Sequence, residues 1–342
     1  MDNVTHSLTA LAMARAGLNR ITSRATLLLL ISANLPDIDI ATAPLGPLRY
    51  LEVHRGYTHC LLALPLMAAL SVLMTAAIFR RKLSQKLSWF SAWIVACLGV
   101  ASHLLLDWTN GYGIRLLLPF SSRWFHLDVN SLYDVIILAA LFLAAVWPSF
   151  AGLVHREIGA QVYKGQASSI AVLTFFALFD IGRAVLHQRA ADKLDSVLYG
   201  GEVPLRVAAL PSRLNPFAWN GIVETPEGFR ILRVDASSDF ADPDASRFFE
   251  KMPRDPAITA ANATPAFRYF QYFARFPVWT EQPAWIGSQR ATRIDLTDLQ
   301  FGAPNSGSFH CVALVDDAAR VLESAFTFGS GRDLGWGEGT PK

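Results

Sequence analysis

The chain has few charged residues for its length. Asp, Glu, Lys and Arg together make up 17% of its 342 residues, whereas about 25% is usual in soluble globular proteins. Hydrophobic residues make up 52%. The formal net charge is only +2, which is too small to suggest a nucleic acid as partner. This composition favours a membrane protein over a soluble one.

Other features are also scarce or missing. The three cysteines, Cys60, Cys97 and Cys311, do not imply a disulfide framework, because the first two lie in apolar segments. The N-terminal residues lack the basic and apolar regions of a cleavable signal peptide, so we expect none. We find no glycine-rich phosphate loop and no nucleophile elbow of a Ser-His-Asp hydrolase. Nucleotide-binding loops and serine hydrolase chemistry are therefore not indicated.

Long apolar runs occupy the first half of the chain. We predict membrane spans at 59–79, 89–107, 132–150 and 168–187, each near the roughly 20 residues that a span requires. Aromatic residues mark the ends of several spans, as expected at a membrane interface. Apolar segments at 4–18 and 25–35 predict helices too short to cross a bilayer. Buried helices of a soluble bundle are the alternative, but such long apolar runs rarely recur in soluble folds.

The composition changes after residue 190, where Pro, Asp, Arg and aromatic residues become frequent. We predict two strands with a tight turn in 219–234, a strand in 266–279, a strand in 291–302 and a strand pair in 308–326. The predicted fold is thus a membrane α-helical bundle followed by a mainly antiparallel β domain. The bundle, residues 1–190, contains about four long spans and two short N-terminal helices; the β domain comprises residues 191–342.

Basic residues predict the orientation in the membrane. Lys and Arg gather in three turns between apolar segments, and the positive-inside rule places such turns in the cytoplasm. The β domain would then be extracytoplasmic. The basic residues concerned are Arg15, Arg20, Arg24, Arg80, Arg81, Lys82, Lys86, Arg156 and Lys164.

Residues able to bind a metal gather on the opposite side of the predicted topology. His103 and Asp107 are four apart in a predicted helix, so both side chains project from one face. Helix capping or an ion pair would explain each short motif separately, but all the motifs fall on one membrane side and therefore predict a shared site. The candidate ligands are His6, Asp37, Asp39, His54, His59, His103, Asp107, His126 and Asp128.

Imidazole and carboxylate ligands suit zinc first, with manganese or iron as alternatives. Two such ions could activate water and hold a phosphate in line for attack. Asp37 or Asp39 would bridge the ions or act as general base, and Arg55 would hold the phosphate. For His155, His187 and His310 we expect structural roles only.

The same motifs carry a family resemblance. DNVTHSLTA, NLPDIDI, HRGYTHC and HLLLDWTNGYGIRLLLPFSSRWFHLD, followed by SLYD, occur in this order within residues 1–190. In these motifs the chain resembles the YdjM-like, LexA-regulated, membrane-bound metal-dependent hydrolases. The resemblance implies a multi-pass protein of the bacterial inner membrane with hydrolase activity, but it does not define a substrate.

A more distant similarity extends to zinc-dependent phospholipase C and related single-strand nucleases, which hold three zinc ions. Those enzymes also use an N-terminal amine and a second H-x-x-x-D pair as ligands. In this sequence Met1 precedes His6 by five residues and the second pair is missing, so two ions are expected, with three as the alternative. The resemblance implies the ligands His6, Asp37, His59, His103, Asp107 and His126.

Together these patterns predict a membrane-bound hydrolase that cleaves a phosphoester of a lipid or lipid-linked molecule at the outer leaflet. Membrane lipid is the expected partner, and the oligomeric state is open. A metal transporter or metal-sensing membrane protein is one alternative, but its ligands would be spread through the depth of the bilayer. A membrane anchor for a binding β domain is another, and it leaves the clustered ligands without a role.

Overall fold

The computed structural model describes residues 1–79, 88–157, 165–238, 241–286, 289–304 and 308–329. The chain divides into two compact units. The first unit is helical and consists of Met1–Ala41, Val53–Gln188 and Pro211–Phe217. The second contains both β-sheets and consists of Thr42–Glu52, Arg189–Leu210 and the chain from Ala218 onward.

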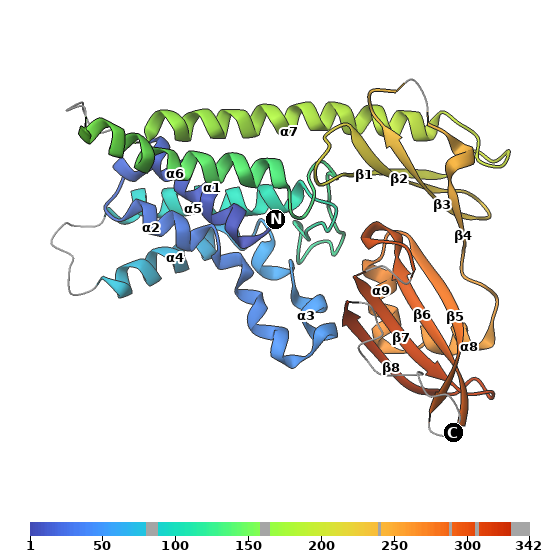
Figure 1. The fold of residues 1–342 in the computed structure, drawn as a ribbon. Helices are drawn as coiled ribbons and strands as arrows, with labels where there is room; N and C mark the ends of the chain where they lie inside the picture. Colours follow the sequence, from blue (N-terminus) through green and yellow to red (C-terminus); the bar gives the residue numbers. More distant parts are fainter. Residues whose placement is uncertain (80–87, 158–164, 239–240, 287–288, 305–307, 330–342) are drawn as a thin grey trace. The chain divides into compact units, whose positions relative to one another are not determined.

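Long helices and short irregular ones make up the first part of the chain (Figure 1); most of α3, the end of η2 and the last residues of α7 belong to the second unit, and the rest to the first. The principal helices are α1 (Asn3–Ala16), α2 (Ala25–Ser32), α4 (Leu64–Ile78), α5 (Trp89–Trp108), α6 (Val135–Glu157) and α7 (Gln166–Asp195). Between α2 and α4 lie the 3₁₀ helix η2 (Leu35–Leu45), the short helix α3 (Pro47–Val53) and the 3₁₀ turn η3 (Tyr57–His59).

Local sequence explains where α1 begins and ends. The Asp2 carboxylate accepts hydrogen bonds from the N–H groups of Val4 and Thr5, which caps the first turn. Gly17 ends the helix with a φ of 146°, a conformation that favours glycine. The predicted short helix at 4–18 is therefore confirmed to within about two residues.

Helix α5 lies at the centre of this unit and packs against α1, α2 and α4. Its buried face carries Val95 and Val100, which meet Leu28 and Leu29 of α2 in the core. A Cβ atom on Gly99 would lie 2.0 Å from the Ser32 hydroxyl oxygen, so the close approach of α2 to α5 requires glycine here. This contact places the end of α2 beside the middle of α5.

Among the described residues, α5, α6 and α7 are long and apolar enough to cross a membrane. Two bent pairs would raise the number of spans to five: Ala25–Ser32 with Leu35–Leu45, bent by 41°, and Pro47–His59 with Leu64–Ile78, bent by 89°. The predicted helical half is confirmed, with three to five spans in place of about four.

The predicted span at 59–79 needs correction. Helix α4 begins only at Leu64, and the residues from His59 to Ala63 form turns. The helix has 15 residues, fewer than a straight span requires. The apolar run extends over the turns at 60–63 and over α4. Hydrophobicity alone therefore did not reveal that the chain bends between them. As a result His59 lies in a turn rather than within a span.

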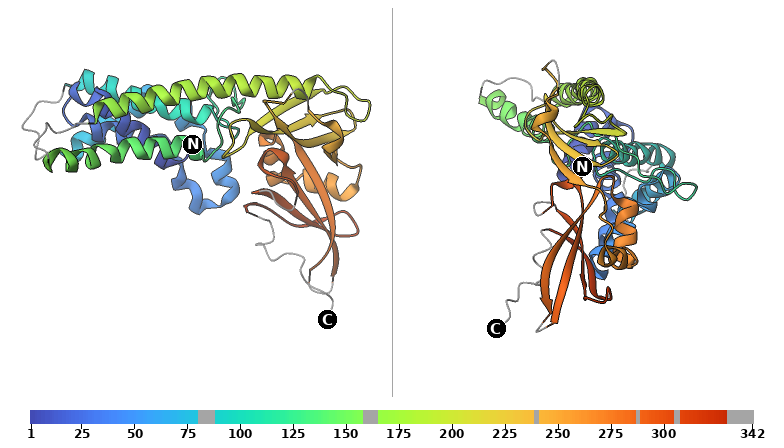
Figure 2. Two further views of the ribbon diagram at one scale, coloured as in Figure 1. Left: turned by 45° about the horizontal axis from the view of Figure 1, so that its top comes forward. Right: turned by 90° about the vertical axis from the view of Figure 1, so that its right-hand side faces the viewer.

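Side-chain contacts bring the ends of several helices together. Arg20 donates a hydrogen bond of 2.8 Å to Gln166 at the start of α7, and Gln166 donates one of 3.0 Å to the carbonyl of Ala16. The Arg24 guanidinium lies 4.5 Å from the ring centre of Phe79, just after α4. The turn between α1 and α2 therefore lies beside the start of α7 and the residue that follows α4 (Figure 2).

Several basic residues used for the topology lie outside the part of the chain whose side chains are described. These are Arg80, Arg81, Lys82, Lys86, Arg156 and Lys164.

The second unit contains two four-stranded sheets, ordered β1-β2-β3-β4 and β5-β6-β7-β8. The pairs β2–β3, β3–β4 and every neighbouring pair of the second sheet are antiparallel. The first sheet comprises β1 (Arg206–Pro211), β2 (Ala218–Glu224), β3 (Gly228–Asp235) and β4 (Arg247–Glu250). The second comprises β5 (Pro277–Ile286), β6 (Gln289–Asp298), β7 (Phe309–Val315) and β8 (Val321–Phe328).

The predicted strands in 219–234, 291–302 and 308–326 are confirmed, but the strand predicted at 266–279 is wrong. Helix α9 (Pro265–Phe273) occupies most of that segment, after the short helix α8 (Pro256–Asn262), and β5 follows it. Thr264 caps α9, and the buried Phe267, Phe270 and Phe273 are spaced by three. The three phenylalanines form an apolar stripe along one face of α9. The strand prediction rested on the high aromatic content of the segment, which does not distinguish a strand from such a helix.

The helical unit also buries an ion pair between α7 and the residue before α6. Arg183 Nη1 lies 3.3 Å from Asp134 Oδ2, and both side chains are buried. Next to this pair, Asn130 donates a hydrogen bond of 2.9 Å to Asp180 Oδ1. Ionised groups at such depth are costly unless they are paired, so the pair ties α7 to the loop that precedes α6.

We predict that Arg183→Leu lowers the free energy of unfolding by about 3–5 kcal/mol, because Asp134 is then a buried charge without this partner. Denaturant unfolding of the detergent-solubilised protein would measure the change. Arg189→Leu, an exposed position of the same helix, should cost less than about 0.5 kcal/mol. The double variant Asp134→Leu/Arg183→Leu should recover more than half of the loss. If the single variant is as stable as the wild type, the pair does not hold the helices together.

Candidate metal centre

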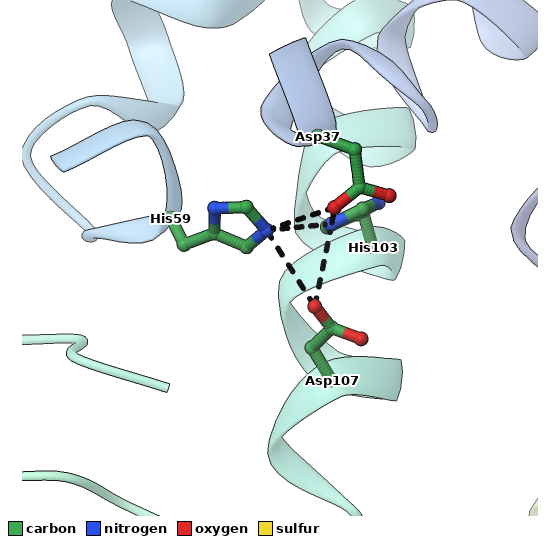
Figure 3. Close-up of side chains that lie close together, drawn as sticks. All are labelled: Asp37, His59, His103 and Asp107. Carbon is green, nitrogen blue, oxygen red and sulfur yellow. Dashed lines mark hydrogen bonds and ion pairs between the residues drawn. The ribbon is translucent and has the colours of Figure 1, made fainter. Parts of the chain in front are cut away.

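Four side chains from three segments of the helical unit point toward one another (Figure 3). Asp37 comes from η2, shortly after α2 ends, and His59 from η3. His103 and Asp107 project from one face of α5, as their spacing of four residues predicts. We call Asp37, His59, His103 and Asp107 the first group.

Distances within the first group are those of ligands around a single ion. His59 Nε2 lies 3.1 Å from His103 Nε2, 3.3 Å from Asp37 Oδ1 and 3.5 Å from Asp107 Oδ2. His103 Nε2 lies 3.6 Å from Asp37 Oδ1 and 3.5 Å from Asp107 Oδ2. A tetrahedral zinc site with bonds of about 2.0–2.1 Å has ligand atoms about 3.3–3.4 Å apart. The four atoms therefore match the size of such a site.

The orientation of each imidazole suits metal binding. His103 Nδ1 lies 2.7 Å from the carbonyl oxygen of Ala33, so this nitrogen carries the proton and Nε2 keeps its lone pair. His59 Nδ1 lies 2.9 Å from the Thr58 hydroxyl and 3.5 Å from Asp39 Oδ2. If His59 Nδ1 donates its proton to Asp39, the Nε2 atoms of His59 and His103 both carry lone pairs. These lone pairs face each other, and a cation bound between them would stabilise the arrangement.

The contacts of Asp107 test independently whether the first group suits a bound cation. Its Oδ1 accepts a hydrogen bond of 2.9 Å from Arg55 Nη2 and contacts the backbone nitrogen of Met1. Its Oδ2 is buried and has no hydrogen-bond partner among the described residues. A buried carboxylate oxygen without a partner is costly. A cation bound to the first group would supply the missing partner.

Asp37 also belongs to a second group, with Asp39 and His54. In each group the potential ligand atoms all lie within 4.8 Å of one another. His54 Nδ1 lies 3.1 Å from Asp39 Oδ1. Because Asp37 is common to both groups, its carboxylate is placed to bridge two ions. The side chains of Asp37 and His54 are 14% and 15% exposed, whereas those of His59, His103 and Asp107 are at most 1% exposed.

The remaining predicted ligands belong to neither group. His6 stacks on His103 with ring centres 3.9 Å apart, and its Nε2 lies 3.4 Å from Asp107 Oδ1. His126 and Asp128 lie in the loop after α5. Backbone hydrogen bonds tie this loop to the end of α5, from Leu127 to the Trp108 carbonyl and from Val129 to the Thr109 carbonyl. The structure thus brings His6 against the first group and leaves His126 and Asp128 beyond both groups.

Several residues that support the site were absent from the sequence prediction. Thr58 and the carbonyl of Ala33 orient the two imidazoles, and Asn110 accepts a hydrogen bond from Arg55. Asn110 lies two residues beyond the end of α5, so helical spacing from Asp107 does not predict its position. A backbone carbonyl such as that of Ala33 has no side-chain signature, and only the packing of α2 against α5 reveals it.

Comparisons with known proteins match the part of the chain that carries both groups. The family model described as "YdjM inner membrane protein" matches residues 1–189, which include every residue of both groups. The uncharacterised protein YfhP of Bacillus subtilis (strain 168) is 24% identical over 174 residues. That alignment covers 50% of this chain and 47% of YfhP, so the chain spans about half the length of this relative. No solved structure shows a significant match. Because the family model covers more than half of the chain, the protein belongs to the YdjM inner membrane protein family.

Proposed function

We propose that this protein is a metal-dependent hydrolase that cleaves a phosphoester of a lipid or lipid-linked molecule at the outer leaflet of the bacterial inner membrane. The observation that carries the proposal is the first group. Four ligand atoms from three segments meet at the spacing of a metal site, and Oδ2 of Asp107 has no hydrogen-bond partner among the residues that the structure describes. Zinc fits the donor set best, and the second group offers a place for another ion.

The bound ions would supply Lewis acidity that activates water and neutralises phosphate oxygens. The chain's own residues would admit the substrate and transfer the proton. Asp37 and His54 are the more exposed members of the two groups, so water and substrate would approach from their side. Asp39 is buried behind them, and its Oδ1 lies 3.1 Å from His54 Nδ1, so it would take up a proton through His54. The first group is buried, so its ligands would keep their positions during the proposed reaction.

Exposed apolar side chains beside the ligands support a lipid-borne substrate. Ile38 and Ile40 alternate with Asp37 and Asp39, and their exposed fractions are 48% and 61%. The carboxylates thus point inward while the isoleucines point outward from the same segment. In a protein of a membrane family these isoleucines would contact acyl chains. An acyl chain lying there would bring its phosphate group near Asp37.

A metal transporter is the second candidate, since both functions need a metal site. Transport predicts ligands at successive depths along a route through the protein. The two groups instead share Asp37 and form one cluster. This concentration favours catalysis over transport.

Metal content tests the proposal directly. We expect the wild-type protein, purified without chelators, to hold one or two equivalents of a transition metal, measured by elemental analysis. His103→Ala and Asp107→Ala should each remove most of this metal, because each deletes a ligand of the first group. His187→Ala, which lies outside both groups, should leave the metal content unchanged and serves as the control. Wild-type protein that carries no stoichiometric transition metal would refute the proposed chemistry.

The proposed topology places the basic turns inside the cell and the β domain outside. Reporter fusions after Lys86 and after Lys342 should therefore report opposite sides of the membrane. Two reporters would be fused at each position: a phosphatase that is active only in the periplasm and a protein that fluoresces only in the cytoplasm. At each position one reporter should be active and the other silent. Both fusion points on the same side would contradict the topology.

The proposed substrate class predicts a preference for long acyl chains. We expect kcat/KM to be at least about tenfold higher for a long-chain phospholipid than for a short soluble phosphodiester, because contacts with the acyl chain can assist the reaction. The assay would compare both compounds in detergent micelles. Ile38→Ser/Ile40→Ser should reduce this ratio and leave turnover of the soluble compound unchanged. Equal turnover of the two compounds by the wild type would instead indicate a substrate that arrives from water.

A further inference from the structure

Arg55 has an unusual backbone and a buried side chain. It lies in the turn between α3 and η3, and its φ of 53° falls in the left-handed region that residues other than glycine rarely adopt. Only 3% of its surface is exposed. A residue is held in such a conformation when surrounding contacts impose it. The contacts of Arg55 therefore indicate which interactions require its left-handed conformation.

The two terminal nitrogens of the guanidinium donate to protein acceptors, and Nε is shielded from solvent without a hydrogen-bond partner in the described part of the chain. Nη2 donates a hydrogen bond of 2.9 Å to Asp107 Oδ1. Nη1 donates to Asn110 Oδ1 at 3.0 Å and to the carbonyl oxygen of Gly113 at 3.2 Å. The plane also lies over the ring of Tyr112, with 4.7 Å between the guanidinium carbon and the ring centre. These contacts orient Arg55 toward α5 and the loop that follows it.

The backbone of the same residue serves the second group. The N–H of Arg55 donates a hydrogen bond of 3.0 Å to Asp39 Oδ2. One residue therefore contacts a carboxylate of each group, Asp39 through its backbone and Asp107 through its side chain. The left-handed conformation sends the backbone N–H and the side chain to two different carboxylates.

We infer that Arg55 is a positioning residue for the metal ligands rather than a group that binds the substrate phosphate, as its charge alone suggested. By engaging Oδ1 of Asp107, it leaves Oδ2 directed at His59 and His103, where a cation would bind. A residue that held phosphate would need free N–H groups facing the open side. Here both terminal nitrogens donate to buried acceptors. This inference rests on the metal site of the proposed function.

The test replaces the guanidinium and measures metal affinity as well as activity. Arg55→Met should weaken metal binding by about 10–100-fold, as is typical when a group that orients a ligand is lost. Titration of the apoprotein with zinc against a competing chelator would give the affinity. Cobalt(II) bound in place of zinc should show an altered visible spectrum, because the geometry around Asp107 changes. Arg55→Lys should restore part of the affinity, since it keeps the charge but not the planar fork.

Arg123→Met is the matched control, because Arg123 is exposed and lies in the loop after α5, the loop to which Asn110 and Gly113 belong. Its metal affinity and cobalt spectrum should equal those of the wild type. Asn110→Leu removes an acceptor of Arg55 and should weaken metal binding in the same direction by a smaller factor. This variant keeps the inference testable if Arg55→Met fails to fold.

The outcomes separate the two proposals. Wild-type protein that binds no metal would refute the proposed function itself. If the wild type binds metal and Arg55→Met binds it equally well, the proposed function stands and the positioning role fails. Weaker inhibition by inorganic phosphate in Arg55→Met, at saturating metal and with unchanged metal affinity, would assign Arg55 to the substrate instead.

Discussion

The helical unit depends on burying several carboxylates and imidazoles at one place. Asp107 is buried, and Asp37 and Asp39 lie within a few ångströms of His59. Moving ionised groups out of water costs several kcal/mol for each, unless opposite charges compensate them. Arg55 and the N-terminal amino group of Met1 compensate the charge of Asp107, whereas the carboxylates of Asp37 and Asp39 lie beside imidazoles and leave negative charge in the cluster. A divalent cation would balance it, and the fold is arranged so that one could bind.

Packing between two helices explains why these groups meet. Because residue 99 is glycine, α2 approaches α5 closely at Ser32. The last residues of α2 then reach the middle of α5, where the Ala33 carbonyl orients His103. The chain turns into η2 immediately afterwards and delivers Asp37 beside the same imidazole.

Part of this could be predicted from the sequence. The spacing of His103 and Asp107 defines one face of a helix, and apolar runs of about 20 residues indicated α5, α6 and α7. Period-two alternation identified β6. The failures have physical causes. Aromatic content suggested a strand where α9 forms, although its buried phenylalanines are spaced by three. The start of α4 is marked only by Pro65 in its first turn, a signal that the surrounding apolar run obscured.

The role of Arg55 shows most clearly what a sequence leaves open. A cation between two histidines looked suited to an anionic substrate, yet its partner Asp107 lies 52 residues away in the chain. Only the turn of α5 into the following loop, which presents Asn110 and Gly113, determines where the guanidinium points. A positive charge near a metal site can bind the substrate or orient a ligand. Burial favours the second role for Arg55, because a guanidinium whose terminal nitrogens donate to protein acceptors could reach a phosphate only by giving up those hydrogen bonds. Under the proposed function, the more exposed Asp37 and His54 would then meet the substrate, on the side where Ile38 and Ile40 would contact its acyl chain.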